Sequence, residues 1–147
     1  MSTSNTGSLD GSIAGRVVVV TGADQPLGQG LAAGIGAAGA VVVAVPTDAL
    51  GTRPDAEVAF AAVATEHGPI AGVVHAAIDP VAFERVPMQD VDDARWDAVW
   101  EQTLRRTLFV LQAGHTQMHA AGGAFVVVTS VVGMAGGSPA GLGLISW

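Results

Sequence analysis

The sequence contains no cysteine, no tyrosine and no lysine. Without cysteine, the chain has no disulfide, no thiolate nucleophile and no cysteine ligand for a metal. Six arginines stand against thirteen acidic residues, which gives a net charge of −7. A charge of this sign repels a phosphate backbone and leaves no basic face for one. We therefore expect no nucleic-acid partner.

Long apolar runs are also absent. A run such as VVVAV at 41–45 is far shorter than the ~20 residues of a membrane-spanning helix. The N-terminal stretch MSTSNTGSLDGS is polar and lacks the basic start and apolar core of a signal peptide. We expect a loose tail over 1–14, no membrane association and a cytoplasmic location. Half of the residues are apolar and only 13% are charged, which favours one compact domain over 15–147.

Four short β-branched runs predict strands: RVVVVTG from Arg16, AVVVAV from Ala40, AGVVHAA from Ala71 and GAFVVVTS from Gly123. Each run is continuous rather than alternating, as in strands that helices cover on both faces. The pattern therefore predicts a parallel sheet.

Three helical stretches separate these runs. The first is expected from Pro26 or Leu27 to Gly39. The second is expected to follow Arg53-Pro54, with Asp55 as its N-cap, and to end at Gly68-Pro69. The third and longest is expected from about Asp92 to His119. Its large apolar residues recur at helical spacing: Trp96, Trp100, Leu104, Leu108 and Leu111. The resulting β-α-β-α-β-α-β order predicts a doubly wound, Rossmann-like α/β fold with a three-layer α/β/α arrangement.

The stretch TGADQPLG leaves the first expected strand and enters the first expected helix. It resembles the T-G-x-x-x-G-x-G turn of the short-chain dehydrogenase/reductase family. Further stretches resemble successive parts of that family: LDGSIAGRVVVVTG, GAAGAVVVAV, GVVHAA, WDAVWEQTLRRTLFVLQA and GGAFVVVTSVVG. Together they extend over nearly all of 9–147. The resemblance implies an oxidoreductase scaffold that uses NAD or NADP.

The glycine turn departs from the family pattern at one position. Gly22 and Gly28 match the outer glycines, but Pro26 replaces the middle one. Proline lacks an N–H group, yet it suits the first position of a helix. We expect an intact fold and a weakened pyrophosphate site, whose implied residues are Gly22, Pro26, Leu27, Gly28, His75 and Ala76. The other glycines of this helix, Gly30, Gly34 and Gly36, are interpreted as positions of close packing between helix and sheet.

The ribose end departs as well. Pro46 stands where NAD-dependent relatives place an acidic residue, with Asp48 or Arg53 as substitutes if the loop folds back. Only one helix is expected between Pro46 and His75, where the family has a helix, a strand and a further helix. The family's adenine-binding wall is therefore expected to be missing.

The catalytic set of the family is a serine, a tyrosine, a lysine and an asparagine. By resemblance, Ser130 matches the serine, Thr103 takes the asparagine position, Gly143 the tyrosine position and Trp147 the lysine position. A serine without an activating base is an ordinary strand-end hydroxyl. The chain alone is therefore expected to be inactive.

Other chemistry finds little support in the residues. His115 and His119 lie four apart on the third expected helix but lack a third metal ligand. His75 ends a central strand, where a general base is conceivable, although active relatives also carry a histidine there. The acidic residues Asp90, Asp92, Asp93, Asp97 and Glu101 are interpreted as solvated partners of the helix dipole. No metal site is expected.

Three functional hypotheses remain. The first is a non-catalytic family member that forms a homo- or hetero-oligomer through the helix Trp96 to His119, in one version with an active subunit. The second is an N-terminal fragment of an NAD(P)-dependent oxidoreductase whose tyrosine and lysine follow Trp147. The third is a Rossmann module that binds a nucleotide or acyl-CoA without turning it over.

Overall fold

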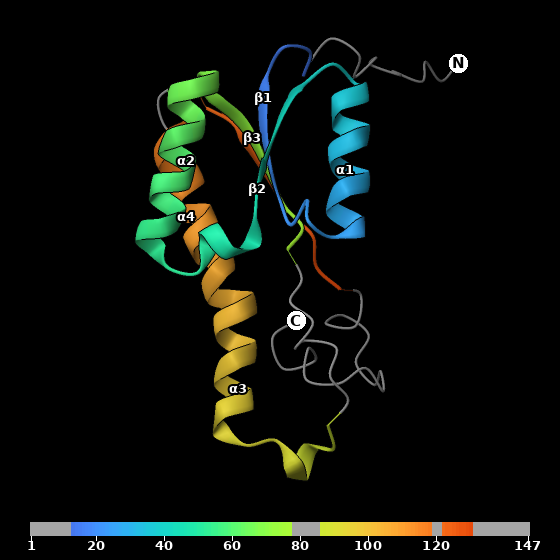
Figure 1. Ribbon diagram of the computed structural model, residues 1–147, viewed down its shortest axis with the longest axis vertical. Helices are drawn as coiled ribbons and strands as arrows, with labels where there is room; N and C mark the ends of the chain where they lie inside the picture. Colours follow the sequence, from blue (N-terminus) through green and yellow to red (C-terminus); the bar gives the residue numbers. More distant parts are fainter. Residues whose placement is uncertain (1–12, 78–85, 119–121, 131–147) are drawn as a thin grey trace, which may run out of the picture.

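The computed structural model describes residues 13–77, 86–118 and 122–130. Four parallel strands form one sheet: β1 (Val17–Thr21), β2 (Val41–Val45), β3 (Ile70–His75) and β4 (Ala124–Val127), in the order β2-β1-β3-β4. All four expected strands are confirmed, and helices cover both faces of the sheet (Figure 1). The Rossmann-like doubly wound fold that the sequence predicts is therefore correct.

The helices form the two outer layers. Helix α1 (Pro26–Ala37) covers one face, while α2 (Arg53–His67) and α4 (Arg106–Met118) lie side by side on the other (Figure 1). Two short 3-10 helices, η2 (Thr47–Leu50) and η4 (Met88–Asp90), precede α2 and α3. Helix α3 (Asp93–Trp100) continues through the π-helix η5 (Glu101–Arg105) into α4 and extends well beyond the sheet.

Alternate residues of β1 belong to different cores. Val17 and Val19 pack with Phe60 of α2 and Val110 of α4, whereas Val18 and Val20 pack under Leu31, Ala32 and Ile35 of α1. Every residue of β1 is buried because side chains alternate between two covered faces. This double covering explains why the strand is a continuous apolar run.

The edges of the sheet are covered less completely. In β2 only Val45 is buried, while its other four residues are exposed or half-buried. The residues of β4 alternate between exposed and half-buried. On the side of α1, a groove of about 340 Å³ runs across β3 and β4, and Val126 is 53% exposed there. The prediction that every strand is covered on both faces is therefore wrong for the edge strands β2 and β4.

Helix boundaries follow from glycine, proline and capping residues. Helix α1 begins at Pro26 and ends before Gly39, which has a φ of +91°, as expected. Helix α2 begins at Arg53, so Asp55 is not its N-cap. The N-cap is Thr52, whose Oγ1 accepts a hydrogen bond from the Asp55 N–H at 3.3 Å. Proline suits only the first turn of a helix, which places the cap before Pro54.

The third expected helix is interrupted. Asp92 caps α3 by accepting a hydrogen bond from the Arg95 N–H at 2.8 Å, but the π-helix η5 replaces one regular turn. The sequence predicts a single uninterrupted helix, which is wrong at this turn. His119 lies outside the described residues.

Candidate functional site

The strand order reverses between β1 and β3. From β1 the chain moves outward to β2, and then returns past β1 to β3. In open α/β sheets, ligands bind beyond the carboxyl ends of the strands at such a reversal. The residues at this point are Thr21 and Gly22 after β1, and His75 and Ala76 after β3, joined by a hydrogen bond from the Ala76 N–H to the Thr21 carbonyl at 3.2 Å.

Gly22 and Gly28 are required by close backbone contact. Gly22 has a φ of +76°, and a Cβ on it would lie 2.6 Å from Cα of Ala77. A Cβ on Gly28 would lie 2.0 Å from the carbonyl oxygen of Gly22. The first turn of α1 therefore packs directly on the turn that follows β1, in the arrangement that brings a helix N-terminus toward a phosphate.

Pro26 occupies the first turn of α1 and is exposed, as is Leu27 beside it. The N-cap residue Gln25 makes no side-chain capping bond, and the first turn contains no acidic residue. No side chain of the helix's own first turn therefore neutralises its positive end.

The structure does not show the close packing that the sequence predicts at the remaining glycines of α1. A Cβ on Gly30 or Gly34 would meet nothing within 4 Å, and one on Gly36 would only touch Val42 at 3.8 Å. Gly30 and Gly34 lie on the exposed side of the helix, so their interpretation as close-packing positions is wrong.

His75 is a buried neutral residue. Its Nδ1 shares a hydrogen bond with Oγ1 of Thr21 at 2.6 Å, and its exposed fraction is 4%. Burial, together with the positive charge of Arg106, lowers the pKa of His75 to about 4. The side chain ties the ends of β1 and β3 together.

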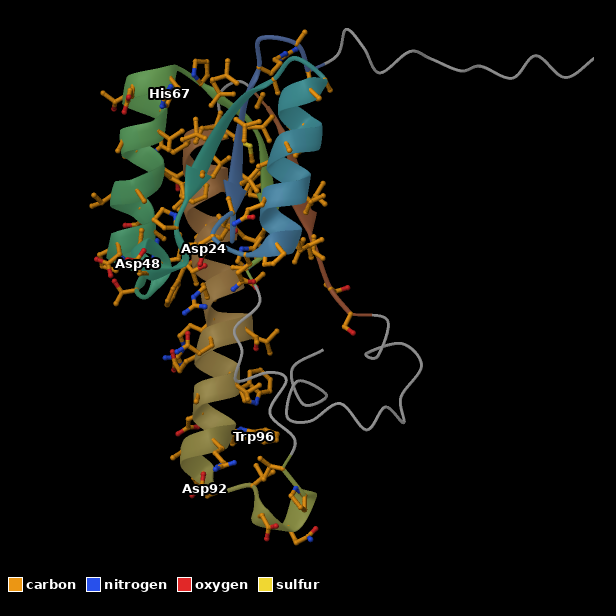
Figure 2. All side chains as sticks on the ribbon, turned by 45° about the vertical axis from the view of Figure 1, so that its right-hand side comes forward. Asp24, Asp48, His67, Asp92 and Trp96 are labelled. Atoms are coloured by element: carbon orange, nitrogen blue, oxygen red, sulfur yellow. The ribbon has the colours of Figure 1, made fainter. Side chains whose placement is uncertain are left out.

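A pocket of about 550 Å³ lies beside these strand ends. Its lining comes from the turn after β1, the segment after β2 and the helix on the opposite face: Asp24, Pro46, Thr47, Asp48, Gln102 and Arg106. Figure 2 shows Asp24 and Asp48 near each other at the edge of the sheet where β1 and β2 end. This volume lies within the range of about 300–1,000 Å³ that is typical of small-molecule sites.

Polar contacts fix both walls of this pocket. Thr47 Oγ1 donates to Asp24 Oδ1 at 3.1 Å, which joins the segments after β1 and β2. Opposite them, Arg106 is only 8% exposed and donates to the backbone carbonyl and side-chain Oε1 of Gln102. The pocket thus has two carboxylates at its rim and one buried guanidinium in its wall.

Of the residues that line this pocket, the sequence identifies only Pro46 and Asp48 as candidate site residues. Arg106 is the clearest omission. It shares the buried side of the long helix with Val99, Val110 and Ala113, at spacings of seven, four and three residues. A charged residue in such an apolar series is the signal that could have revealed it.

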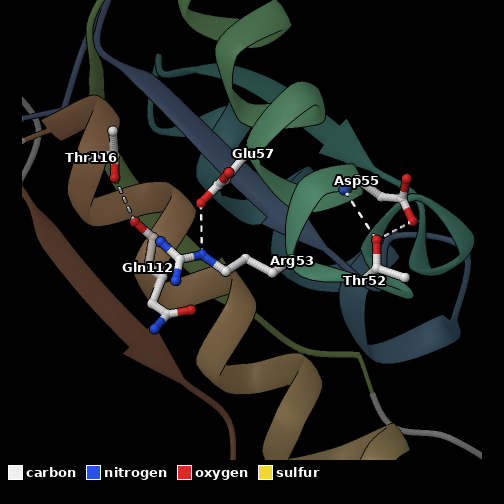
Figure 3. A network of polar contacts seen from close by, with 6 residues as sticks. All are labelled: Thr52, Arg53, Asp55, Glu57, Gln112 and Thr116. Carbon is white, nitrogen blue, oxygen red and sulfur yellow. Dashed lines mark hydrogen bonds and ion pairs between the residues drawn. The ribbon is translucent and has the colours of Figure 1, made fainter.

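Arg53 does not reach this pocket. Its Nε donates to Oε1 of Glu57 at 2.7 Å, and the side chain lies near Gln112 of α4 (Figure 3). It lines a different pocket, with Gln112, His115 and other residues of α4. Of the two substitutes expected at the ribose end, only Asp48 therefore lines the pocket beside the ends of β1 and β2.

The expected catalytic positions are only partly described. Thr103 lies within the π-helix η5, and its Oγ1 donates to the carbonyl of Val99. Ser130 is half-buried three residues after β4. Gly143 and Trp147 lie outside the described residues. Within 13–77, 86–118 and 122–130, no group of three potential metal-ligating side chains occurs.

Comparisons with known proteins agree with this geometry. The KR domain family matches residues 8–141. A short-chain dehydrogenase/reductase from Mycobacterium ulcerans superposes with a TM-score of 0.77 at 26% identity, over 90% of this chain and 57% of that protein. The chain belongs to the short-chain dehydrogenase/reductase family. No curated protein sequence matches this chain significantly.

Other solved structures show the same fold. A Shigella flexneri short chain dehydrogenase complexed with NADP has a TM-score of 0.79 at 20% identity, over 91% of this chain and 66% of that one. An Escherichia coli protein complexed with NADPH has a TM-score of 0.79 at 22% identity, with the same two coverages. This short-chain dehydrogenase/reductase sequence thus spans less than two thirds of these neighbours' lengths. Within the described part of the chain, no helix is long and apolar enough to cross a membrane.

Proposed function

We propose that this chain is a nucleotide-binding member of the short-chain dehydrogenase/reductase family that does not transfer hydride by itself and works within an oligomer. One contrast carries the proposal. The turn between β1 and α1 keeps the glycine contacts of a dinucleotide fold, whereas the 147 residues contain no tyrosine and no lysine. Within these 147 residues, the scaffold occurs together with neither of the residue types that form the family's proton-transfer pair.

The described residues fit the adenosine half of NAD or NADP. Gly22 and Gly28 set the approach of α1 to the strand end, and the first turn of α1 offers backbone N–H groups for the pyrophosphate. The pocket between Asp24, Asp48 and Arg106 has room for a nucleoside. Pro26 removes one N–H donor from this turn, so we expect weak binding. A bound NAD(P) would supply the hydride carrier, but no residue of this chain would move the substrate's proton.

A row of apolar side chains supports association. Trp96, Trp100, Leu104 and Leu108 are all exposed, at fractions between 38% and 50%, and the rings of Trp96 and Trp100 lie 6.0 Å apart. We call these four residues the apolar ridge. In Figure 2, Trp96 projects sideways from α3 below the sheet. Contiguous exposed apolar surface of this kind is typical of protein–protein contacts.

The π-helix helps to align the apolar ridge. Side chains four apart on an α-helix are offset by about 40°, so a longer row winds around the helix. The i→i+5 turn of η5 (Glu101–Arg105) winds less per residue and opposes that drift between Trp100 and Leu104. We propose that the ridge packs on a subunit of the same fold.

Two measurements on the purified chain test this function. Isothermal titration calorimetry with NADH is expected to show binding, while assays with NAD(P)H and carbonyl substrates show no turnover. Sedimentation velocity is expected to show an oligomer that the double substitution Trp100→Ser and Leu104→Ser dissociates. Val58→Ser is the matched control, because Val58 is 70% exposed on α2. NAD(P)-dependent turnover by the chain alone, or a monomer at every concentration, would overturn the proposal.

A second candidate is an N-terminal part of a longer, active oxidoreductase. The coverage of 57% of the Mycobacterium ulcerans protein favours it. Expression of the coding region continued beyond Trp147 tests this candidate. A longer product with a Tyr-x-x-x-Lys sequence and NAD(P)-dependent turnover would support it, whereas an in-frame stop after Trp147 would exclude it.

A further inference from the structure

We infer that the groove across β3 and β4 binds a single-chain alkyl carboxylate, with the alkyl chain on the sheet and the carboxylate at Arg16. The groove has a volume of about 340 Å³ and lies on the side of α1. Arg16, Ala71 and Gly123, which line it, mark the amino ends of β1, β3 and β4. The groove is therefore separate from the proposed nucleotide site at the carboxyl ends of the strands, and the inference does not depend on that site.

Small residues form the floor of the groove. Strand pairing places Gly72 of β3 between Val18 of β1 and Ala124 of β4. A Cβ on Gly72 would meet its nearest neighbours at 3.7 Å, which is an ordinary contact. Close packing therefore does not require a glycine at this position.

Backbone geometry does not require this glycine either. The pairing of β1 with β3 shifts register just before Gly72, between Val17 and Val18, but the form of bulge that depends on glycine needs a positive φ. Gly72 is not among the described glycines with positive φ. Glycine inside a strand weakens it, and it often marks a place where a ligand approaches the backbone closely.

Apolar side chains border this floor. The next row along the strands pairs Val74 with Val126, and Val126 is 53% exposed. Ile35 of α1 and Ile13 also line the groove. Small-molecule sites are typically apolar, with a few polar groups that fix the orientation of the ligand.

Arg16 supplies the polar group. Among the described residues that line the groove, it alone is charged. Its side chain is exposed and makes no ion pair within the described part of the chain, although the sequence has thirteen acidic residues. A guanidinium binds a carboxylate through two parallel hydrogen bonds. An anionic head group therefore complements this end of the groove.

The dimensions favour one alkyl chain over a protein segment. Val20 pairs with Val74, and Val74 with Val126, so this row lies four residues, or about 13 Å, along the strands from Arg16. An alkyl chain of medium length fits this span. The eleven described residues that line the groove are fewer than the about 20–30 on each side of a standard protein interface.

Calorimetric titration of the purified chain with three probes tests the ligand class. Decanoate is expected to bind once per chain, and at least about threefold more tightly than octanoate, because each methylene that leaves water favours binding. Decyltrimethylammonium has a positive head group on the same alkyl chain and is expected to bind more weakly. Nonspecific adsorption would give the opposite order, since the net charge of −7 attracts the cation.

Two variants test the position of the ligand. Arg16→Gln should weaken decanoate binding by about tenfold and leave decyltrimethylammonium unchanged. Gly72→Val places a β-branched side chain on the floor of the groove and should abolish decanoate binding, while urea denaturation shows a stable fold. Arg53→Gln is the matched control, because it removes the same charge from the start of α2, beside a different pocket.

Several results would overturn the inference. They are no binding of decanoate by the wild-type chain, equal binding of decanoate and decyltrimethylammonium, or an Arg16→Gln variant that binds decanoate like the Arg53→Gln control. Sedimentation velocity gives a further check. An oligomer that dissociates in Arg16→Gln or Gly72→Val would show that the groove is a protein interface instead. None of these results bears on the proposed nucleotide site.

Discussion

The helices that follow β1 and β2 begin in opposite ways. Helix α2 has Thr52 as its N-cap and Asp55 in its first turn, and the hydroxyl of Thr52 also donates to the Asp55 carboxylate at 2.6 Å. Helix α1 has neither a side-chain capping bond nor an acidic residue in its first turn. Since both helices start with a proline in the first turn, the difference does not come from backbone geometry. The start of α2 is completed by its own residues, whereas the start of α1 suits an external anion.

Gly28→Ala is expected to have the largest effect on stability, because it displaces the start of α1 on which this comparison depends. The added Cβ would lie 2.0 Å from the Gly22 carbonyl oxygen, so the start of α1 must move away from β1. We expect a loss of about 3 kcal/mol in the free energy of unfolding, the upper end for overpacked sites. Urea denaturation followed by tryptophan fluorescence measures it.

Gly30→Ala is the matched control on the same helix. A Cβ there meets nothing within 4 Å, and alanine is a better helix former by about 1 kcal/mol. This variant should therefore be more stable than the wild type. A Gly28→Ala protein as stable as Gly30→Ala would show that α1 does not pack on the turn as described.

The second prediction concerns His75, whose hydrogen bond to Thr21 joins the carboxyl ends of β3 and β1. Its pKa is lowered from 6.5 to about 4 in the fold, so the unfolded chain takes up a proton first as the pH falls. Stability is then lost between about pH 6.5 and pH 4, by up to about 3 kcal/mol. His75→Gln should flatten this pH dependence in urea denaturation. Equal slopes for wild type and His75→Gln would contradict the buried neutral state.

The sequence predicts the start of α1 more accurately than the start of α2. The strands and the glycine turn follow from continuous β-branched runs and from Gly22 and Gly28, because burial on both faces and close backbone contact leave few alternatives. The family resemblance adds the identity of the turn. The N-cap of α2 is misplaced by the choice of Asp55 over Thr52, since both residue types cap helices well.

Other features depend on tertiary packing and leave little trace in the chain. The π-helix at Glu101–Arg105 has no composition signal. The exposed side of α1 that contains Gly30 and Gly34 is set by how Leu31 and Ile35 pack on the sheet. The pocket joins Asp24, Asp48 and Arg106 from three distant segments, and only the strand order brings those segments together.

The smallest expected effect sharpens the comparison most directly, because it exchanges the two kinds of helix start. Gln25 has the extended backbone of an N-cap, with φ −111° and ψ 154°. Gln25→Asp supplies a carboxylate that caps α1 and should stabilise the fold by about 0.5–1 kcal/mol. The same negative charge occupies the place proposed for the pyrophosphate, so NADH affinity in calorimetry should fall by about tenfold.

Thr52→Ala is the control on the other helix. It removes the cap of α2 and about 1 kcal/mol of stability, and it should leave NADH affinity unchanged. If Gln25→Asp stabilised the chain without weakening NADH binding, the start of α1 would be a plain helix end like that of α2, and the proposed phosphate site would lie elsewhere.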